Sequence, residues 1–127
     1  MRWLSKSIIT VAFFALLVFS SCTLPKQDTS WLTGRMYVNE ETSDKIEFIG
    51  ERKFVITFSS SNFYWVKDFP YTFKYVMYEN DNQLNPIEMT SGEGLYFPYR
   101  ILRFSNSTDE IVFTDRSDKS GVFKRVK

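Results

Sequence analysis

Tyr71-Thr72-Phe73-Lys74-Tyr75-Val76-Met77, residues 71–77, is the stretch that decides the fold. Its large apolar side chains alternate with Thr72 and Lys74 at a period of two, which is the spacing of a β-strand with one buried face. A helix would instead place apolar residues three and four positions apart. The stretch therefore predicts a strand whose Tyr71, Phe73 and Tyr75 face a core.

The same alternation recurs on both sides of this strand. Ile46 and Phe48 alternate with polar residues, and after the tight return at residues 50–52 the pattern resumes with Phe54, Ile56 and Phe58, which predicts a β-hairpin. Further short strands are predicted near residues 34–38, 63–66, 83–89, 95–97, 99–104, 110–115 and 121–126. Clusters of Gly, Asn, Asp, Ser and Pro separate them, as expected for turns.

Eight or nine short strands joined by short turns are typical of an up-and-down β-barrel rather than a Greek-key sandwich. No amphipathic helix is indicated. The fold class predicted from the sequence is therefore all-β, a small up-and-down antiparallel barrel of about eight strands.

The N-terminal residues have the order of an export signal. Arg2 and Lys6 form a short basic start, an apolar run extends from Ile8 to Phe19, and two serines precede Cys22, which is the only cysteine in the 127 residues. The 15 residues between Lys6 and Cys22 are fewer than the about 20 that a membrane-spanning helix requires. The run therefore fits the core of a signal peptide better than a permanent anchor.

This arrangement resembles bacterial lipoproteins, with Phe19 in the place where their signals commonly have Leu. The resemblance implies cleavage before Cys22, acylation of its thiol and amino group, and attachment to a membrane. Residues 1–21 would be the signal peptide, 22–30 the lipidated cysteine and its tether, and 31–127 the folded domain. The eight tether residues after Cys22 reach at most about 27 Å when extended.

Attachment through Cys22 also explains why an exported chain has a single cysteine. A lone thiol in an oxidising compartment has no disulfide partner, and a thioether removes its reactivity. The alternative is an ordinary secreted protein with an incidental cysteine. Thr23 stands where some bacteria use Asp to retain lipoproteins in the inner membrane, so the resemblance favours the outer membrane within a bacterial cell envelope.

Charge and composition limit the classes of partner and of chemistry that are possible. Without residues 1–21, which include Arg2 and Lys6, the remaining 106 residues have 14 bases and 15 acids. This is enough chain for one domain and too little positive charge to argue for nucleic acid. Histidine is absent and Cys22 is assigned to the anchor, which removes the usual catalytic triads and zinc sites. We predict no catalytic residues, no metal site and no cofactor.

The folded part resembles the lipocalin-like domains found in many bacterial lipoproteins. The matching segments are Trp31-Leu32-Thr33-Gly34, the hairpin from Ile46 to Phe54, the pair Leu102–Phe104 and Ile111–Phe113, and the end from Gly121 to Arg125. In lipocalins an indole near the first strand packs against an Arg of the last strand. The resemblance therefore implies a barrel-closing pair of Trp31 and Arg125.

The aromatic set of the central strands is the remaining candidate site. It comprises Phe48, Phe54, Ile56, Phe58, Tyr71, Phe73 and Tyr75. These residues either line a cavity for a small apolar ligand or fill the barrel, since an eight-stranded barrel has room for only one of the two. We favour the filled interior, in which case outward rings such as Tyr64, Trp65 or Tyr78 become the more interesting ones.

These observations lead to a hypothesis about function and an alternative. The first is a lipid-anchored, noncatalytic envelope lipoprotein that binds a small apolar ligand or a protein partner. The alternative is an accessory, structural or inhibitor-like envelope protein with a solid barrel and no ligand.

Overall fold

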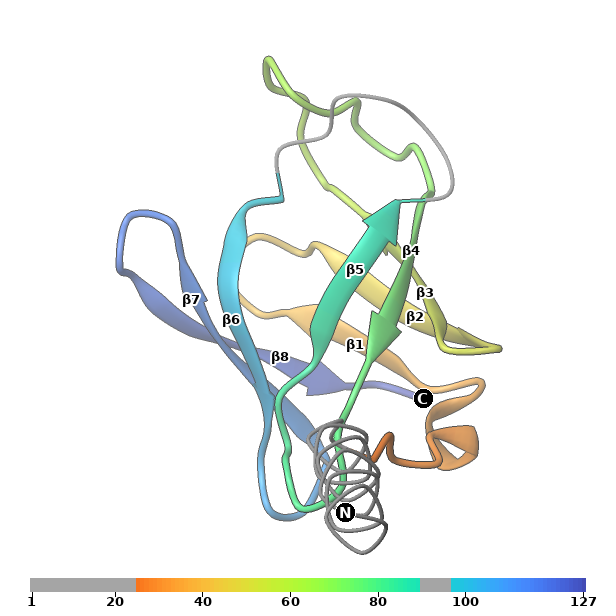
Figure 1. Ribbon diagram of the computed structural model, residues 1–127. Coiled ribbons are helices and arrows are strands. Elements are labelled where there is room, and N and C mark those ends of the chain that lie inside the picture. Colours follow the sequence, from red (N-terminus) through yellow and green to blue (C-terminus); the bar gives the residue numbers. More distant parts are fainter. Residues whose placement is uncertain (1–24, 90–96) are drawn as a thin grey trace, which may run out of the picture.

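Eight antiparallel strands make up most of the computed structural model, which describes residues 25–89 and 97–127 (Figure 1). The strands are β1 (Met36–Asn39), β2 (Lys45–Gly50), β3 (Lys53–Thr57), β4 (Tyr71–Val76), β5 (Asn85–Met89), β6 (Tyr99–Phe104), β7 (Glu110–Asp115) and β8 (Ser120–Arg125). One turn of 3-10 helix, η1 (Ser30–Leu32), precedes them. No helix in the described ranges has the length and apolarity to cross a bilayer.

The strands follow one another around an up-and-down barrel. Each strand from β1 to β5, and each from β6 to β8, pairs with the next, and β1 also pairs with β8, which gives the order β5-β4-β3-β2-β1-β8-β7-β6. All these pairings are antiparallel. The all-β, up-and-down barrel predicted from the alternation is confirmed.

The barrel is nearly closed, and its seam lies between β5 and β6. At one end of the seam Gln83 and Arg103 form an isolated antiparallel bridge, and the Leu84 amide donates to the Leu102 carbonyl at 2.9 Å. The two strands diverge toward the other end (Figure 1), where the partly buried Phe97 packs against the core. Among the described residues, the contacts at this end are between side chains: the Phe97 ring contacts those of Phe54, Phe73 and Tyr99.

The two ends of the barrel differ in what they carry. We call proximal the end at which the chain enters at Pro25, where η1, the turns after β2, β4 and β6, and the C-terminus lie (Figure 1). We call distal the opposite end, with the turns at residues 40–44 and 116–119 and the long loop between β3 and β4. Any tether that leads into Pro25 therefore meets the proximal end.

The tight return predicted between β2 and β3 is a two-residue hairpin loop. Gly50 pairs with Lys53, and the two residues between them, Glu51 and Arg52, have φ of 54° and 56°. Positive φ at both positions matches a type I′ turn, whose twist suits a hairpin. The Arg52 carbonyl accepts a hydrogen bond from the Tyr75 amide at 2.8 Å, which ties the turn to β4.

Two predicted strands differ from the structure. Residues 63–66 lie in the loop between β3 and β4 instead of in a strand, because Asn62 organises a local turn there. Of residues 95–97, only Phe97 is described, and it lies outside any strand. The other predicted strands are present, with ends that shift by up to two residues.

A glycine in β8 makes room for an aromatic ring. Gly121 pairs with Phe113 of β7, and a Cβ added at Gly121 would lie 2.3 Å from the Phe113 Cζ. The buried Phe113 ring is held in place by edge contacts with Tyr99 and Phe123, at centroid distances of 4.8 and 5.4 Å. The ring therefore lies directly over the glycine, in space that a larger residue would need.

Candidate binding surface at the distal end

The aromatic set predicted from the sequence fills the interior of the barrel. Its seven members, Phe48, Phe54, Ile56, Phe58, Tyr71, Phe73 and Tyr75, are all buried, with exposed fractions of at most 6 %. Phe54 stacks on Phe73 at 5.5 Å between ring centroids, and Phe48 contacts both Phe54 and Tyr75. None of the seven lines any of the four pockets described below.

A cation does lie over the Trp31 ring, but it is Arg35, the residue just before β1, and not Arg125. The Arg35 guanidinium carbon is 5.0 Å from the ring centroid, a distance suited to a cation–π contact. Arg125 instead pairs with Asp109 at 3.5 Å. The predicted Trp31–Arg125 pair is thus replaced by Trp31 and Arg35, because Arg35 follows η1 within the same turn of chain.

Cys22 lies outside the described residues, so its predicted role stays a prediction. The segment that follows it is described from Pro25 and is attached to the barrel. The Gln27 amide donates to the Met77 carbonyl at 2.7 Å, and the Glu79 amide to the Pro25 carbonyl at 2.9 Å. The last part of the predicted tether therefore packs along the chain after β4.

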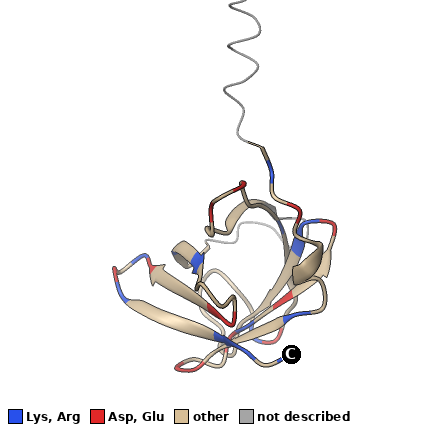
Figure 2. Ribbon diagram, turned by 90° about the horizontal axis from the view of Figure 1, so that it is seen from below, with Lys and Arg blue, Asp and Glu red and all other residues tan. Residues whose placement is uncertain are grey.

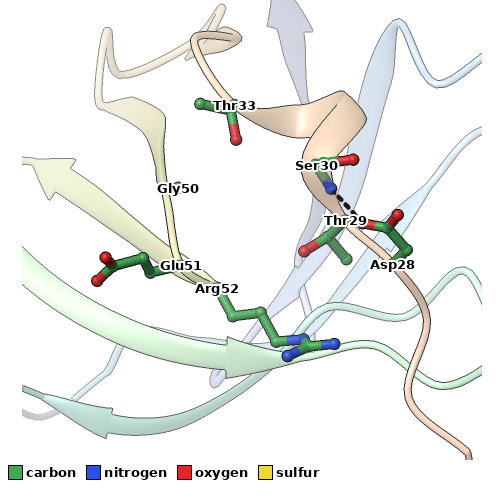
Figure 3. A pocket seen from close by; sticks show the side chains of 7 residues that line it. All are labelled: Asp28, Thr29, Ser30, Thr33, Gly50, Glu51 and Arg52. Atoms are coloured by element: carbon green, nitrogen blue, oxygen red, sulfur yellow. Dashed lines mark hydrogen bonds between the residues drawn. The ribbon is translucent and has the colours of Figure 1, made fainter.

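The largest of the four pockets, about 420 Å³, lies beside this segment (Figure 3). Its lining is polar and includes Asp28, Ser30 and Arg52. The Asp28 carboxylate accepts a hydrogen bond from the Ser30 amide at 3.0 Å, and this bond is the largest cause of its lowered pKa. Arg52 donates to the Gln27 carbonyl at 3.3 Å. These groups hold the segment to the β2–β3 turn.

A loop at the distal end exposes several large apolar side chains. We call residues 58–70, between β3 and β4, the aromatic loop. Phe63 is 94 % exposed, and Tyr64, Val66 and Phe69 are also exposed. The rings of Phe63 and Tyr64 contact each other edge to face at 5.3 Å. An apolar cluster of this kind on a surface is typical of an interaction site.

Internal hydrogen bonds hold the aromatic loop in shape. The Asn62 side chain accepts hydrogen bonds from the amides of Tyr64 and Trp65 at 2.7 and 3.0 Å. The Trp65 indole donates to the Ser60 carbonyl at 3.1 Å and stacks on Phe58 at 4.3 Å. The loop is thus fixed to the core through Trp65, while Phe63 extends into solvent.

Two adjoining pockets continue from the aromatic loop across the distal end. The first, about 250 Å³, is lined by Asn62, Tyr64, Trp65, Pro98, Asp115, Arg116 and Ser117. The second, about 230 Å³, is lined by Asn39, Glu41, Thr42, Asp44, Trp65, Pro98, Tyr99, Phe113, Asp115, Lys119 and Ser120. Both share Trp65, Pro98 and Asp115. They form one groove, and we call its second part the Asp44 pocket.

A buried polar cluster forms part of the Asp44 pocket. Asp44 is 8 % exposed, and its Oδ1 accepts hydrogen bonds from the Ser59 amide at 2.8 Å and the Ser59 hydroxyl at 3.1 Å. Its Oδ2 accepts one from the Tyr99 hydroxyl at 3.2 Å. Burial of Tyr99, and then the nearby Asp44 charge, raises the pKa of that hydroxyl. Tyr99 is therefore a neutral donor at ordinary pH.

Of the rings predicted to point outward, Tyr64 is exposed and lines the groove, Trp65 lines the groove but is partly buried against the core, and Tyr78 is partly buried and lines neither pocket. Asp44 and Tyr99 were not among the predicted site residues. The two interact across 55 positions of the sequence, and Asp44 and Ser59 across 15. An aspartate just before a strand has the pattern of an ordinary turn residue. Only the closed barrel brings these groups together.

Charge is spread around the rest of the barrel. Basic and acidic residues both occur on its several sides in the view of Figure 2. Within the described ranges, no group of three His, Cys, Asp or Glu residues is arranged to hold a metal ion. No family model, curated protein or solved structure matches this chain.

Proposed function

We propose that this protein is a lipid-anchored, noncatalytic binding module of the bacterial envelope, which contacts a protein partner through its distal surface. The observation that carries the proposal is the aromatic loop, where Phe63 is 94 % exposed on a loop fixed by its own hydrogen bonds. Tyr, Trp and Phe are enriched at protein interfaces. A rigid loop also loses little conformational entropy on binding.

The direction in which the chain enters the barrel supports this proposal. Pro25 and η1 lie at the proximal end, so an acylated Cys22 three residues earlier anchors that end near the membrane. The aromatic loop lies at the opposite end (Figure 1). It then points away from the anchoring bilayer, toward proteins of the envelope.

The packing of the interior favours a protein partner over a small apolar ligand. The rings that would line a ligand cavity contact one another instead, for example Phe48 with Tyr75 at 5.6 Å and Phe73 with Phe97 at 5.1 Å. A solid barrel leaves recognition to the loops. The alternative, an accessory or inhibitor-like envelope protein, uses the same surface and differs in what binding does to the partner.

Lipid anchoring is tested by Cys22→Ser in the full chain, expressed in a bacterium. The unaltered protein is expected in the detergent phase of a Triton X-114 separation, with a mass that includes acyl groups. The variant is expected in the aqueous phase or as the unprocessed chain, because it has no thiol to acylate. Ser20→Ala serves as the control and should partition like the unaltered protein. Equal partitioning of Cys22→Ser would refute the anchor.

Partner binding is tested by placing a photo-crosslinking amino acid at position 63 of the intact lipoprotein in its own envelope. The control position is Val126, which is also apolar and is 60 % exposed but lies at the proximal end. A discrete protein adduct is expected from position 63, with a yield at least tenfold above that from position 126. Equal yields, or adducts from position 126 alone, would contradict a distal binding surface.

A further inference from the structure

The Asp44 pocket holds a buried carboxyl group that no basic side chain of the described residues pairs with. Asp44 is more than nine-tenths buried, and the ion pairs of the described residues include none to its carboxylate. Buried charges in proteins are usually paired, because hydrogen bonds alone offset only part of the desolvation cost. The carboxylate accepts hydrogen bonds from the Ser59 amide and the Tyr99 hydroxyl, and shares the single proton of the Ser59 hydroxyl with the Thr42 carbonyl, out of the about four bonds it can accept. One acceptor position on Oδ2 is left.

The rest of the lining has the chemistry that surrounds an organic cation. Glu41 and Asp115 add two carboxylates, and Lys119 is the only base that lines the pocket. Trp65 and Phe113 supply aromatic walls, and aromatic faces attract ammonium and guanidinium groups by a cation–π interaction. The pocket is therefore net negative, partly aromatic and open to solvent at its rim.

The size of the pocket limits its occupant. Its volume of about 230 Å³ is below the roughly 300 to 1,000 Å³ of sites that enclose a whole small molecule. It suits the end of a single side chain. The two pockets also adjoin at Trp65, with Tyr64 of the aromatic loop lining one and Asp44 lining the other. A protein seated on the aromatic loop would cover this groove.

We infer that the Asp44 pocket receives the cationic end of a lysine or arginine side chain from the partner protein that binds the aromatic loop. The inference rests on the proposed function and adds the chemistry of the contact. Asp44 supplies the fixed charge, Trp65 the aromatic face, and the rim carboxylates attract the approaching cation. The aromatic loop supplies affinity, and the pocket selects a partner with a basic residue at the matching place.

The pocket can be tested alone with n-butylguanidinium as the probe. In the full chain carrying Trp3→Phe and Trp31→Phe, held in detergent, Trp65 is the only indole and reports on the pocket by fluorescence. A saturable change is expected with n-butylguanidinium. Its neutral isostere n-butylurea should bind at least tenfold more weakly. Equal binding of the two probes would overturn the inference.

Variants of the pocket sharpen this test. Asp44→Asn should weaken n-butylguanidinium binding at least tenfold, and Asp109→Asn, which removes a charge at the proximal end, should change it less than twofold. Two exposed lining residues give tests that do not depend on a buried substitution. Glu41→Gln should weaken binding about twofold to threefold and Lys119→Gln should strengthen it by a similar factor. Unchanged affinity in all of these variants would refute an electrostatic site.

The partner's role is tested by crosslinking from position 63 in the Asp44→Asn background. The yield of the partner adduct is expected to fall at least fivefold, while Asp109→Asn leaves it unchanged. An undiminished yield in Asp44→Asn would overturn this inference and leave the proposed function intact. Absence of any adduct in the unaltered protein would instead contradict the proposed function. It would then also contradict the inference that a partner side chain enters the Asp44 pocket.

Discussion

Replacing Phe48 with alanine is expected to lower the free energy of unfolding by about 3 to 5 kcal/mol, the range for removing a phenyl ring from a close-packed core. Phe48 is 1 % exposed and lies at the centre of the aromatic interior. Its ring contacts those of Tyr37, Phe54, Tyr75 and Phe104 at centroid distances of 5.8, 6.0, 5.6 and 6.0 Å. These rings come from different strands, so the cavity cannot close by a local shift.

Chemical denaturation followed by circular dichroism measures this effect. The matched control is Phe63→Ala, which removes the same atoms from a ring that is 94 % exposed. The control should change the free energy of unfolding by no more than about 0.5 kcal/mol, because surface substitutions rarely do more. Similar values for the two variants would mean that Phe48 does not lie in a packed interior.

The second large effect is expected from Gly121→Ala, which should destabilise the domain by about 1 to 3 kcal/mol, as overpacking of a core does. The added Cβ would lie 2.3 Å from Phe113 Cζ, closer than two such atoms can approach. The ring cannot easily move away, because Tyr99 and Phe123 pack against it. Movement of the ring would also alter the Asp44 pocket, which Phe113 lines.

A double-mutant comparison tests the cause. In the Phe113→Leu background the smaller side chain leaves room for the new methyl group, so Gly121→Ala should cost less than half of its effect in the unaltered protein. The cost would be the same in both backgrounds if Gly121 mattered only for the conformational freedom of the strand. A neutral or stabilising Gly121→Ala would show that the ring does not occupy this space.

The period-two pattern was sufficient to predict the barrel because a strand that buries one face must alternate apolar and polar residues. Tyr71, Phe73 and Tyr75 face the core as predicted, and Thr72 and Lys74 lie between them with partial exposure. The seam could not be predicted in the same way. It depends on where the chain before β5 approaches β6, as at the isolated bridge between Gln83 and Arg103, which is a property of the whole sheet and has no local sequence signal.

The prediction of a strand at residues 63–66 failed for a reason that can be stated. Phe63, Tyr64, Trp65 and Val66 are all strand-forming types, but three of the four are exposed and the amides of two bond to Asn62. Local side-chain hydrogen bonds thus outcompete sheet pairing. Asn62, directly before the run, was the one signal in this stretch that favoured a turn.

The Asp44 pocket could not be predicted from any segment of the sequence. Asp44, Ser59, Tyr99 and Phe113 come from four separate parts of the chain. Their residue types are common in turns and cores, and only their arrangement at the distal end gives them a shared environment. The contact of Trp31 with Arg35 in place of Arg125 also depends on the three-dimensional arrangement, in which Arg125 pairs with Asp109.

Because β1 pairs with β8, the barrel can be completed only after β8 has formed. Tyr37 lies opposite Arg125, so the second neighbour of β1 is β8, the strand that is farthest from it in the sequence. Contacts between such distant segments form slowly, because a long loop must close before they are made. The edge of β1 that pairs with β8 would therefore stay unpaired until β8 has folded against it, and a truncation before β8 would leave that strand edge exposed to aggregation.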